Sequence, residues 1–185
     1  RDRDATTQAE CKSCPAGYKG SVPDGTIVHA CVSCGNGQYS AAGAVVCNQC
    51  PKGQFVPTAK QSAVLTSVAD CEACAAGTYG VVATDLTPSC TSCPGGYYGA
   101  SAGVLGCAAC AAGKFAGSTG LTVCQDCPTG EVASTASLAC SACPTGRFSA
   151  TDQSRCLTCT LGSYLDGTTS ADCKSCAAGE KGILS

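Results

Sequence analysis

Cysteine is the residue type whose chemistry and spacing carry most information in this sequence. The chain has 185 residues and 20 cysteines, and all 20 fall into ten Cys-x-x-Cys pairs. Two such pairs can supply four thiolates to a zinc ion, and one pair can act as a redox dithiol. Cysteines from different pairs can also form structural disulfides. The pattern therefore admits three chemistries, and the composition has to decide among them.

The composition favours disulfides. Val, Leu, Ile and Phe make up 27 of the 185 residues, and Trp and Met are absent, so an ordinary hydrophobic core is excluded. Small secreted proteins with a weak core are typically held by cross-links, and an even number of cysteines allows complete pairing. We expect structural disulfides at Cys11, Cys14, Cys31, Cys34, Cys47, Cys50, Cys71, Cys74, Cys90, Cys93, Cys107, Cys110, Cys124, Cys127, Cys140, Cys143, Cys156, Cys159, Cys173 and Cys176.

Zinc-binding repeats with four cysteine ligands per metal are the main alternative, because the spacing of the pairs also fits zinc ribbons. The single histidine and the few Lys and Arg residues near the pairs argue against it, since four thiolates per metal would carry uncompensated charge. A thioredoxin-type redox role is disfavoured because ten equivalent motifs without a βαβ context are typical of a structural function.

The charge distribution excludes several classes of function. The net charge is −2, and the 11 Lys and Arg residues are scattered, so no basic surface for nucleic acid is expected. No apolar run approaches the ~18 residues of a membrane-spanning helix. His29 is the one histidine, and it is interpreted as a strand residue. We expect no catalytic residues, no cofactor and no metal site, and therefore no enzyme.

A repeat accompanies the cysteine pairs. Successive pairs are 20, 16, 24, 19, 17, 17, 16, 16 and 17 residues apart. A glycine stands three residues after the second cysteine of every pair, and in seven units an aromatic residue follows two positions later, as in Gly113 and Phe115. The glycine predicts a tight turn with positive φ, and the aromatic residue begins a short strand. A second short strand is predicted to lead into the next pair, as in Val45-Val46-Cys47 and Thr122-Val123-Cys124.

The predicted fold class is therefore small and disulfide-rich, mostly irregular with short β-hairpins, and the hairpins stack into an elongated repeat rod. The insertion from Ala59 to Asp70 is expected to be a loop, with one or two helical turns as the alternative. Residues 1–10 form a polar leader or an arm that docks onto the next subunit, residues 11–180 form ten tandem repeats, and residues 181–185 form the C-terminal end.

Two schemes of disulfide pairing are open. In a block scheme, neighbouring pairs are joined first to first and second to second, as in Cys11–Cys31 with Cys14–Cys34 and Cys47–Cys71 with Cys50–Cys74. In a relay, the second cysteine of each pair joins the first of the next, which leaves Cys11 and Cys176 over. The block scheme is preferred because it uses every thiol locally. By chain entropy, each disulfide that closes a loop of about 15 residues contributes ~3 kcal/mol.

Other positions carry weaker signals. Asn48-Gln49-Cys50 is a rare form of the glycosylation sequon, and Asn48 is interpreted as a plain surface residue because Cys50 is expected to be bridged. Ligand contacts, if there are any, are expected in the insertions at residues 15–30, 51–70 and 75–89, and at Tyr97 and Tyr98.

Segments such as Cys11-Lys-Ser-Cys14-Pro-Ala-Gly-Tyr18 and Cys140-Ser-Ala-Cys143-Pro-Thr-Gly-Arg-Phe148 resemble the cysteine-rich repeats of ephrin-receptor and tumour-necrosis-factor-receptor type. The Ala, Ser, Thr and Gly filler over residues 11–180 is more similar to the immobilisation antigens of ciliates, and less closely to variant-specific surface proteins of protozoan parasites. The resemblance implies an abundant, protease-resistant coat protein, usually held by a glycolipid anchor. Ser185 is the candidate anchor residue, and an ordinary chain end is the preferred alternative.

These observations predict a non-enzymatic extracellular structural protein, a subunit of a cell-surface coat or a fibre, that associates with itself. The alternatives are a receptor-like ectodomain that recognises a protein or a glycan, and the zinc-binding repeat protein with four cysteines per site. The expected location is extracellular, either secreted or on the cell surface, with contact to a membrane only through a lipid anchor.

The rod makes a prediction for scattering in solution. A compact domain of this length has a radius of gyration of about 16 Å. Ten hairpins of roughly 10 Å each give a rod of about 100 Å, with a radius of gyration near 30 Å. Small-angle X-ray scattering on the oxidised chain is expected to give the larger value, and a value near 16 Å would rule out the rod.

Overall fold

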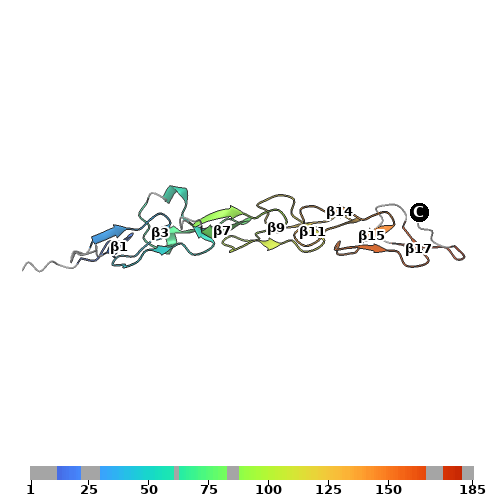
Figure 1. Cartoon of the computed structure of the whole chain (residues 1–185), viewed down its shortest axis with the longest axis horizontal. Helices are drawn as coiled ribbons and strands as arrows, with labels where there is room; N and C mark the ends of the chain where they lie inside the picture. The colour runs from blue at the N-terminus through green and yellow to red at the C-terminus, as the bar shows by residue number, and fades with distance from the viewer. Residues whose placement is uncertain (1–11, 22–29, 61–62, 83–87, 166–172, 181–185) are drawn as a thin grey trace, which may run out of the picture. The chain divides into compact units, whose positions relative to one another are not determined.

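The computed structural model of the chain describes residues 12–21, 30–60, 63–82, 88–165 and 173–180. Within these ranges the chain forms short antiparallel two-stranded hairpins joined by turns, and its helical content is limited to two 3₁₀ turns (Figure 1). The expected fold class, a small disulfide-rich protein with short β-hairpins, is confirmed. The insertion that was expected to be a loop contains the two 3₁₀ turns, η1 (Thr58–Lys60) and η2 (Val68–Asp70).

Nine hairpins are found in the described part of the chain. They are β1 (Tyr18–Ser21) with β2 (Ala30–Ser33), β3 (Gln38–Tyr39) with β4 (Asn48–Gln49), β5 (Gln54–Phe55) with β6 (Glu72–Ala73), β7 (Thr78–Val82) with β8 (Pro88–Ser92), β9 (Tyr97–Tyr98) with β10 (Ala108–Ala109), β11 (Lys114–Phe115) with β12 (Gln125–Asp126), β13 (Glu131–Val132) with β14 (Ser141–Ala142), β15 (Arg147–Ser149) with β16 (Cys156–Thr158), and β17 (Ser163–Tyr164) with β18 (Lys174–Ser175).

The turn after each cysteine pair is the same in all ten units. The residue after the glycine donates its N–H to the carbonyl of the residue after the second cysteine, at 3.0–3.2 Å, as Lys114 does to Ala111. The ten glycines have φ between +74° and +89°. This combination is a type II β-turn, in which the third residue must have positive φ and is therefore usually glycine. The predicted role of these glycines is confirmed.

In six of the nine hairpins the second strand lies between the two cysteines of the next pair, whereas β2 and β8 begin before the first cysteine and β16 begins at it. The prediction that strands precede the pair at Val45-Val46 and Thr122-Val123 was wrong. In the sixth hairpin, for example, Lys114 faces Asp126 and Phe115 faces Gln125, with Cys124 before the strand and Cys127 after it. In seven units the N–H of the second cysteine donates to the carbonyl of the preceding turn glycine, at 2.8–3.4 Å. This hydrogen bond fixes the register, and it leaves Val45, Val46 and Val123 as exposed residues ahead of the strand.

The disulfides form a relay, so the preferred block scheme was wrong. The second cysteine of one pair lies beside the first cysteine of the next, with Cα atoms 5.5–5.8 Å apart, a normal separation for a bridge. The nine bonds are Cys14–Cys31, Cys34–Cys47, Cys50–Cys71, Cys74–Cys90, Cys93–Cys107, Cys110–Cys124, Cys127–Cys140, Cys143–Cys156 and Cys159–Cys173.

The cysteines in these nine bonds are the ones that the zinc alternative requires as thiolate ligands, so the bonds argue against that alternative. Cys176 is half-buried and is the one cysteine among the described residues without a disulfide. Cys11, the other cysteine that a relay leaves over, lies outside the described residues.

The contacts of the chain divide it into two compact units, Arg1–Glu72 with Val82–Ser89 and Ala73–Val81 with Cys90–Ser185. In the first unit, Cys50, Val56 and Leu65 form a buried cluster, against which Tyr39 and Cys71 pack. In the second unit the buried side chains are sulfur and small groups, with Cys74, Cys93, Cys110 and Ala116 fully shielded from solvent. Disulfide sulfur therefore takes the place that large aliphatic side chains occupy in an ordinary core.

Within the second unit the hairpins follow one another in chain order (Figure 1) and are joined by backbone hydrogen bonds. The turn-glycine N–H of Gly77, Gly96 and Gly113 donates to the carbonyl of Gly99, Ala116 and Ala133, respectively, at 2.8–2.9 Å. Each acceptor stands three positions after the turn glycine of the following hairpin.

This third position is the packing site between hairpins, and it needs a small side chain. It is Gly, Ala or Ser in eight of the ten repeats, namely Gly20, Ser40, Gly80, Gly99, Ala116, Ala133, Ser149 and Gly182, and Val56 and Leu165 are the exceptions. Ser40 and Ala116 are fully buried. Sequence analysis missed this position, although its small residues repeat in register with the turn glycines.

Contacts also reach beyond the adjacent hairpin. A Cβ added to Gly77, Gly96 or Gly113 would lie 2.2, 2.2 or 1.9 Å from the carbonyl oxygen of Gly120, Ala136 or Asp152, respectively. Each of these oxygens belongs to the hairpin two positions further along the chain. The turn glycine is therefore required for its positive φ and also for the close approach of a third hairpin.

A series of three glycine-to-alanine variants separates these two requirements. Gly113→Ala introduces backbone strain at φ +83° and a clash, whereas Gly162→Ala introduces strain at φ +81° with no described atom within 4 Å. Gly106→Ala introduces neither. Strain at such a position costs about 1–3 kcal/mol. Denaturant unfolding of the oxidised chains is expected to rank the losses of stability as Gly113→Ala, then Gly162→Ala, then Gly106→Ala.

In this series Gly106→Ala is the matched control, and its stability is expected to stay within about 1 kcal/mol of the parent chain. Equal losses for Gly113→Ala and Gly162→Ala would show that the contact with the third hairpin contributes nothing.

Candidate functional site

The structure places the sequence-predicted site residues as follows. Asn48 is an exposed residue of β4, and Cys50, which completes its sequon, is 6% exposed and bonded to Cys71. Tyr97 is exposed on β9 and Tyr98 is half-buried beside it, so the two side chains do not form a common surface. His29 and Ser185 lie outside the described residues.

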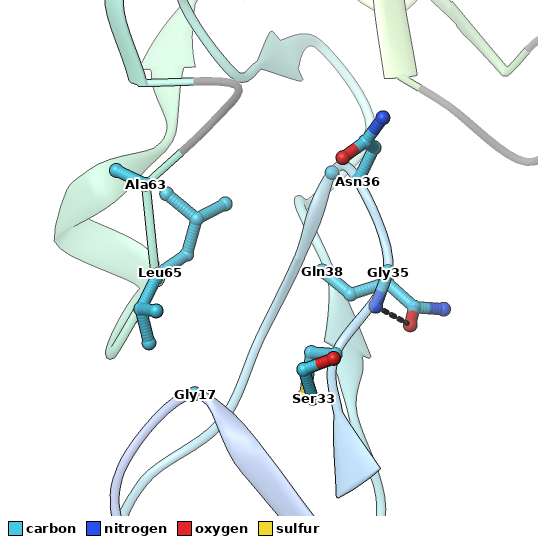
Figure 2. A pocket seen from close by; sticks show the side chains of 10 residues that line it. Gly17, Ser33, Gly35, Asn36, Gln38, Ala63 and Leu65 are labelled. Atoms are coloured by element: carbon cyan, nitrogen blue, oxygen red, sulfur yellow. Dashed lines mark hydrogen bonds between the residues drawn. The ribbon is translucent and has the colours of Figure 1, made fainter.

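Of the three insertions, the one at residues 51–70 is described over most of its length, and it contributes to a pocket. The pocket has a volume of about 190 Å³ and lies within the first unit. It is lined by Gly17, Ser33, Cys34, Gly35, Asn36, Gly37, Gln38, Ala63, Val64 and Leu65. The turn of the second repeat, from Ser33 to Gln38, forms one side, and Ala63 and Leu65 lie across from it (Figure 2).

The wall formed by the second repeat consists largely of backbone. Its turn contains two glycines, Gly35 and Gly37, and Gly37 is buried with φ +74°. The N–H of Gly35 donates to Oε1 of Gln38 at 3.3 Å, a bond that holds the Gln38 carboxamide against the turn (Figure 2). Asn36 is exposed, so its carboxamide is accessible to a ligand at the rim of the pocket.

The opposite wall is aliphatic and is fixed to the first two repeats. Leu65 is 5% exposed, and its carbonyl accepts the N–H of Ser40 at 3.3 Å. Val64 lies against Gly17, where an added Cβ would be 1.9 Å from Val64 Cγ1. Val64 nevertheless remains 54% exposed, which leaves part of its side chain facing solvent. The aliphatic wall therefore contacts the first two repeats directly, and the two walls differ in chemistry.

Asp70 fixes the end of the insertion. Its Oδ2 accepts the N–H of Thr66 at 2.9 Å and the N–H of Ser67 at 3.2 Å, and the Ser67 hydroxyl accepts the N–H of Ala69 at 3.3 Å. This reciprocal arrangement is a capping box at the start of η2. The backbone hydrogen bonds from Thr66 and Ser67, assisted by Lys60 at 3.9 Å, lower the pKa of Asp70 below its ordinary value of 3.8.

The described ranges contain neither a metal site nor a membrane-spanning helix. No group of three or more His, Cys, Asp or Glu residues in these ranges is placed to hold a metal ion. No helix in the same ranges is long and apolar enough to cross a bilayer.

Sequence comparison leaves the family open. No family model matches the sequence, and no curated protein is significantly similar to it. The repeat pattern and its disulfides are therefore the basis for any statement about function.

The role of Asp70 predicts a pH dependence confined to the insertion. Because the folded pKa is lowered, the carboxylate stabilises the capping box above its ordinary pKa, and this stabilisation is lost as the pH falls through the lower folded value. The amide chemical shifts of Thr66 and Ser67, followed by NMR, are expected to titrate with a midpoint below 3.8.

Asp70→Ala is expected to speed hydrogen exchange at Thr66 and Ser67 at neutral pH. Asp152→Ala is the matched control, because Asp152 accepts hydrogen bonds from Ser154 in the second unit and its pKa is lowered by them. That variant is expected to leave Thr66 and Ser67 unchanged. A midpoint at or above 3.8 would contradict the capping role.

Proposed function

We propose that this chain is a non-enzymatic structural protein of an extracellular coat or fibre. The observation that supports the proposal most directly is the relay of nine disulfides, one for each hairpin. Cross-links at this density are typical of proteins in an oxidising environment outside the cell. They stabilise a chain that has almost no aliphatic core, and they do so repeat by repeat.

The relay gives each repeat the same internal construction. Every disulfide closes its own hairpin, with a sequence separation of 13 to 21 between the bonded cysteines, and no two disulfide loops overlap. Each closure stabilises its hairpin by ~3 kcal/mol, chiefly through the unfolded state. A chain built in this way resists local unfolding along its whole length, which suits a protein exposed to proteases at a surface.

The surface chemistry is also consistent with a coat. The net charge is −2, and the exposed large hydrophobic residues include Val45, Leu105, Val123 and Leu138, each 61–76% exposed and shortly before a cysteine pair. A weakly charged surface with aliphatic residues recurring from repeat to repeat supports association between copies of the chain. By the resemblance to ciliate immobilisation antigens, such a coat would be held to the membrane by a lipid anchor, for which Ser185 is the candidate residue.

A second candidate, a receptor-like ectodomain, is favoured by one observation. The pocket in the first unit lies where the repeat is interrupted by its longest insertion, and segments that depart from a regular scaffold are common sites of binding.

Self-association of the purified protein tests the coat proposal. Light scattering over a range of concentrations, with electron microscopy of the same samples, is expected to show ordered assemblies that dissociate under reductant as the hairpins unfold. Deletion of residues 1–10 separates two routes: assembly is lost if these residues form a docking arm and retained if the repeats themselves associate. A chain that stays monomeric at all concentrations and captures a foreign ligand in stoichiometric amount would contradict the coat and favour the ectodomain.

A further inference from the structure

The pocket is a preformed feature of the first unit, and the insertion that builds it has its own means of support. The step of 24 residues between the pairs at Cys47 and Cys71 is the longest in the chain. Leu65 joins the buried cluster of Cys50 and Val56, and Asp70 caps η2. The segment that forms the pocket wall is thus held by the packing of Leu65 and by the hydrogen bonds of Asp70. The wall is therefore formed without a ligand.

The lining excludes charged ligands as the preferred occupants. None of the ten lining residues is Asp, Glu, Lys, Arg or His. Transfer of an anion or a cation from water into this pocket would cost free energy, because no lining side chain carries a compensating charge. The lining also contains no carboxylate or imidazole to bind a metal ion, and its cysteine, Cys34, is bonded to Cys47.

The two walls match a molecule with one polar edge and one apolar face. Gly35 is exposed and carries no side chain, so a ligand can approach the backbone of the turn closely. The accessible carboxamide of Asn36 can both donate and accept hydrogen bonds. Across from them, the exposed part of Val64 offers C–H surface.

The volume limits the size of the ligand. Pockets for drug-sized molecules measure about 300–1,000 Å³, and this one measures about 190 Å³. It can therefore enclose a single small ring, and the remainder of a larger molecule would extend into solvent.

We propose that this pocket binds one neutral sugar ring, the terminal residue of a glycan. The hydroxyl groups of the ring would bond to Asn36 and to the turn, and its C–H face would pack on Val64. This proposal rests on the second candidate function, the binding ectodomain. If the protein forms a coat and binds no sugar, the sugar-binding proposal is refuted and the coat proposal stands.

NMR titration of the ¹⁵N-labelled, oxidised chain tests the proposal. The probes are the methyl glycosides of glucose, galactose, mannose and N-acetylglucosamine, with sialic acid as the charged comparison and a short neutral peptide as the competing class. At least one neutral glycoside is expected to shift the amides of residues 35–38 and 63–65 in a saturable manner, and to do so more strongly than sialic acid or the peptide.

Two variants localise the binding. Asn36→Ala removes the rim carboxamide and is expected to weaken binding by about two- to tenfold, the effect of one neutral hydrogen bond. Asn48→Ala removes an exposed carboxamide of β4 outside the pocket and is expected to change nothing. The spectrum of each variant also shows whether the fold is intact.

Absence of saturable shifts with every glycoside would overturn the proposal. So would shifts located outside the pocket, stronger binding of sialic acid or the peptide, or equal effects of Asn36→Ala and Asn48→Ala. Self-association is measured separately, so failure of the pocket and failure of the coat give different results.

Discussion

The hydrogen bond between the turn glycine and the second cysteine of the next pair is the interaction on which the rest of the structure depends. As in Cys110 N–H to Gly96 O at 2.9 Å, it sets the register in seven of the nine described hairpins. The turn and the register together bring the second cysteine of one pair beside the first cysteine of the next, as with Cys93 and Cys107, and therefore decide which two sulfurs meet. The disulfide then keeps the hairpin closed, although such short strands would not be stable alone.

Stacking follows from the same geometry. Once the turn is formed, its glycine N–H points toward the next hairpin, and the residue that receives it must be small, as Ala116 and Ala133 are. The carbonyl of a third hairpin then approaches the same glycine. Each hairpin thus contributes one disulfide and a set of backbone contacts, and the stability of the stack grows with the number of hairpins.

The insertion after Cys50 shows what happens where the pattern is interrupted. Val56 replaces the small residue, and it is accommodated because Leu65 packs beside it to form the aliphatic cluster of the first unit. The backbone of the insertion is held by Asp70, and its Ala63–Leu65 segment becomes one wall of the pocket. A departure from the repeat has thus become a separately supported element that forms one wall of a pocket.

The sequence by itself determined the repeat, the turn and the class of fold. Ten glycines at a constant distance from ten cysteine pairs predict tight turns, because few other residues adopt positive φ, and a chain with so few large aliphatic residues requires cross-links. The tertiary structure decided which cysteines pair and where the second strand lies. Both depend on the register of the two strands. The spacing of the Cys-x-x-Cys motifs is compatible with more than one register, and each register brings different sulfurs together. The pocket also required the structure, since nothing in the residues around Asn36 indicates that Val64 will lie across from them.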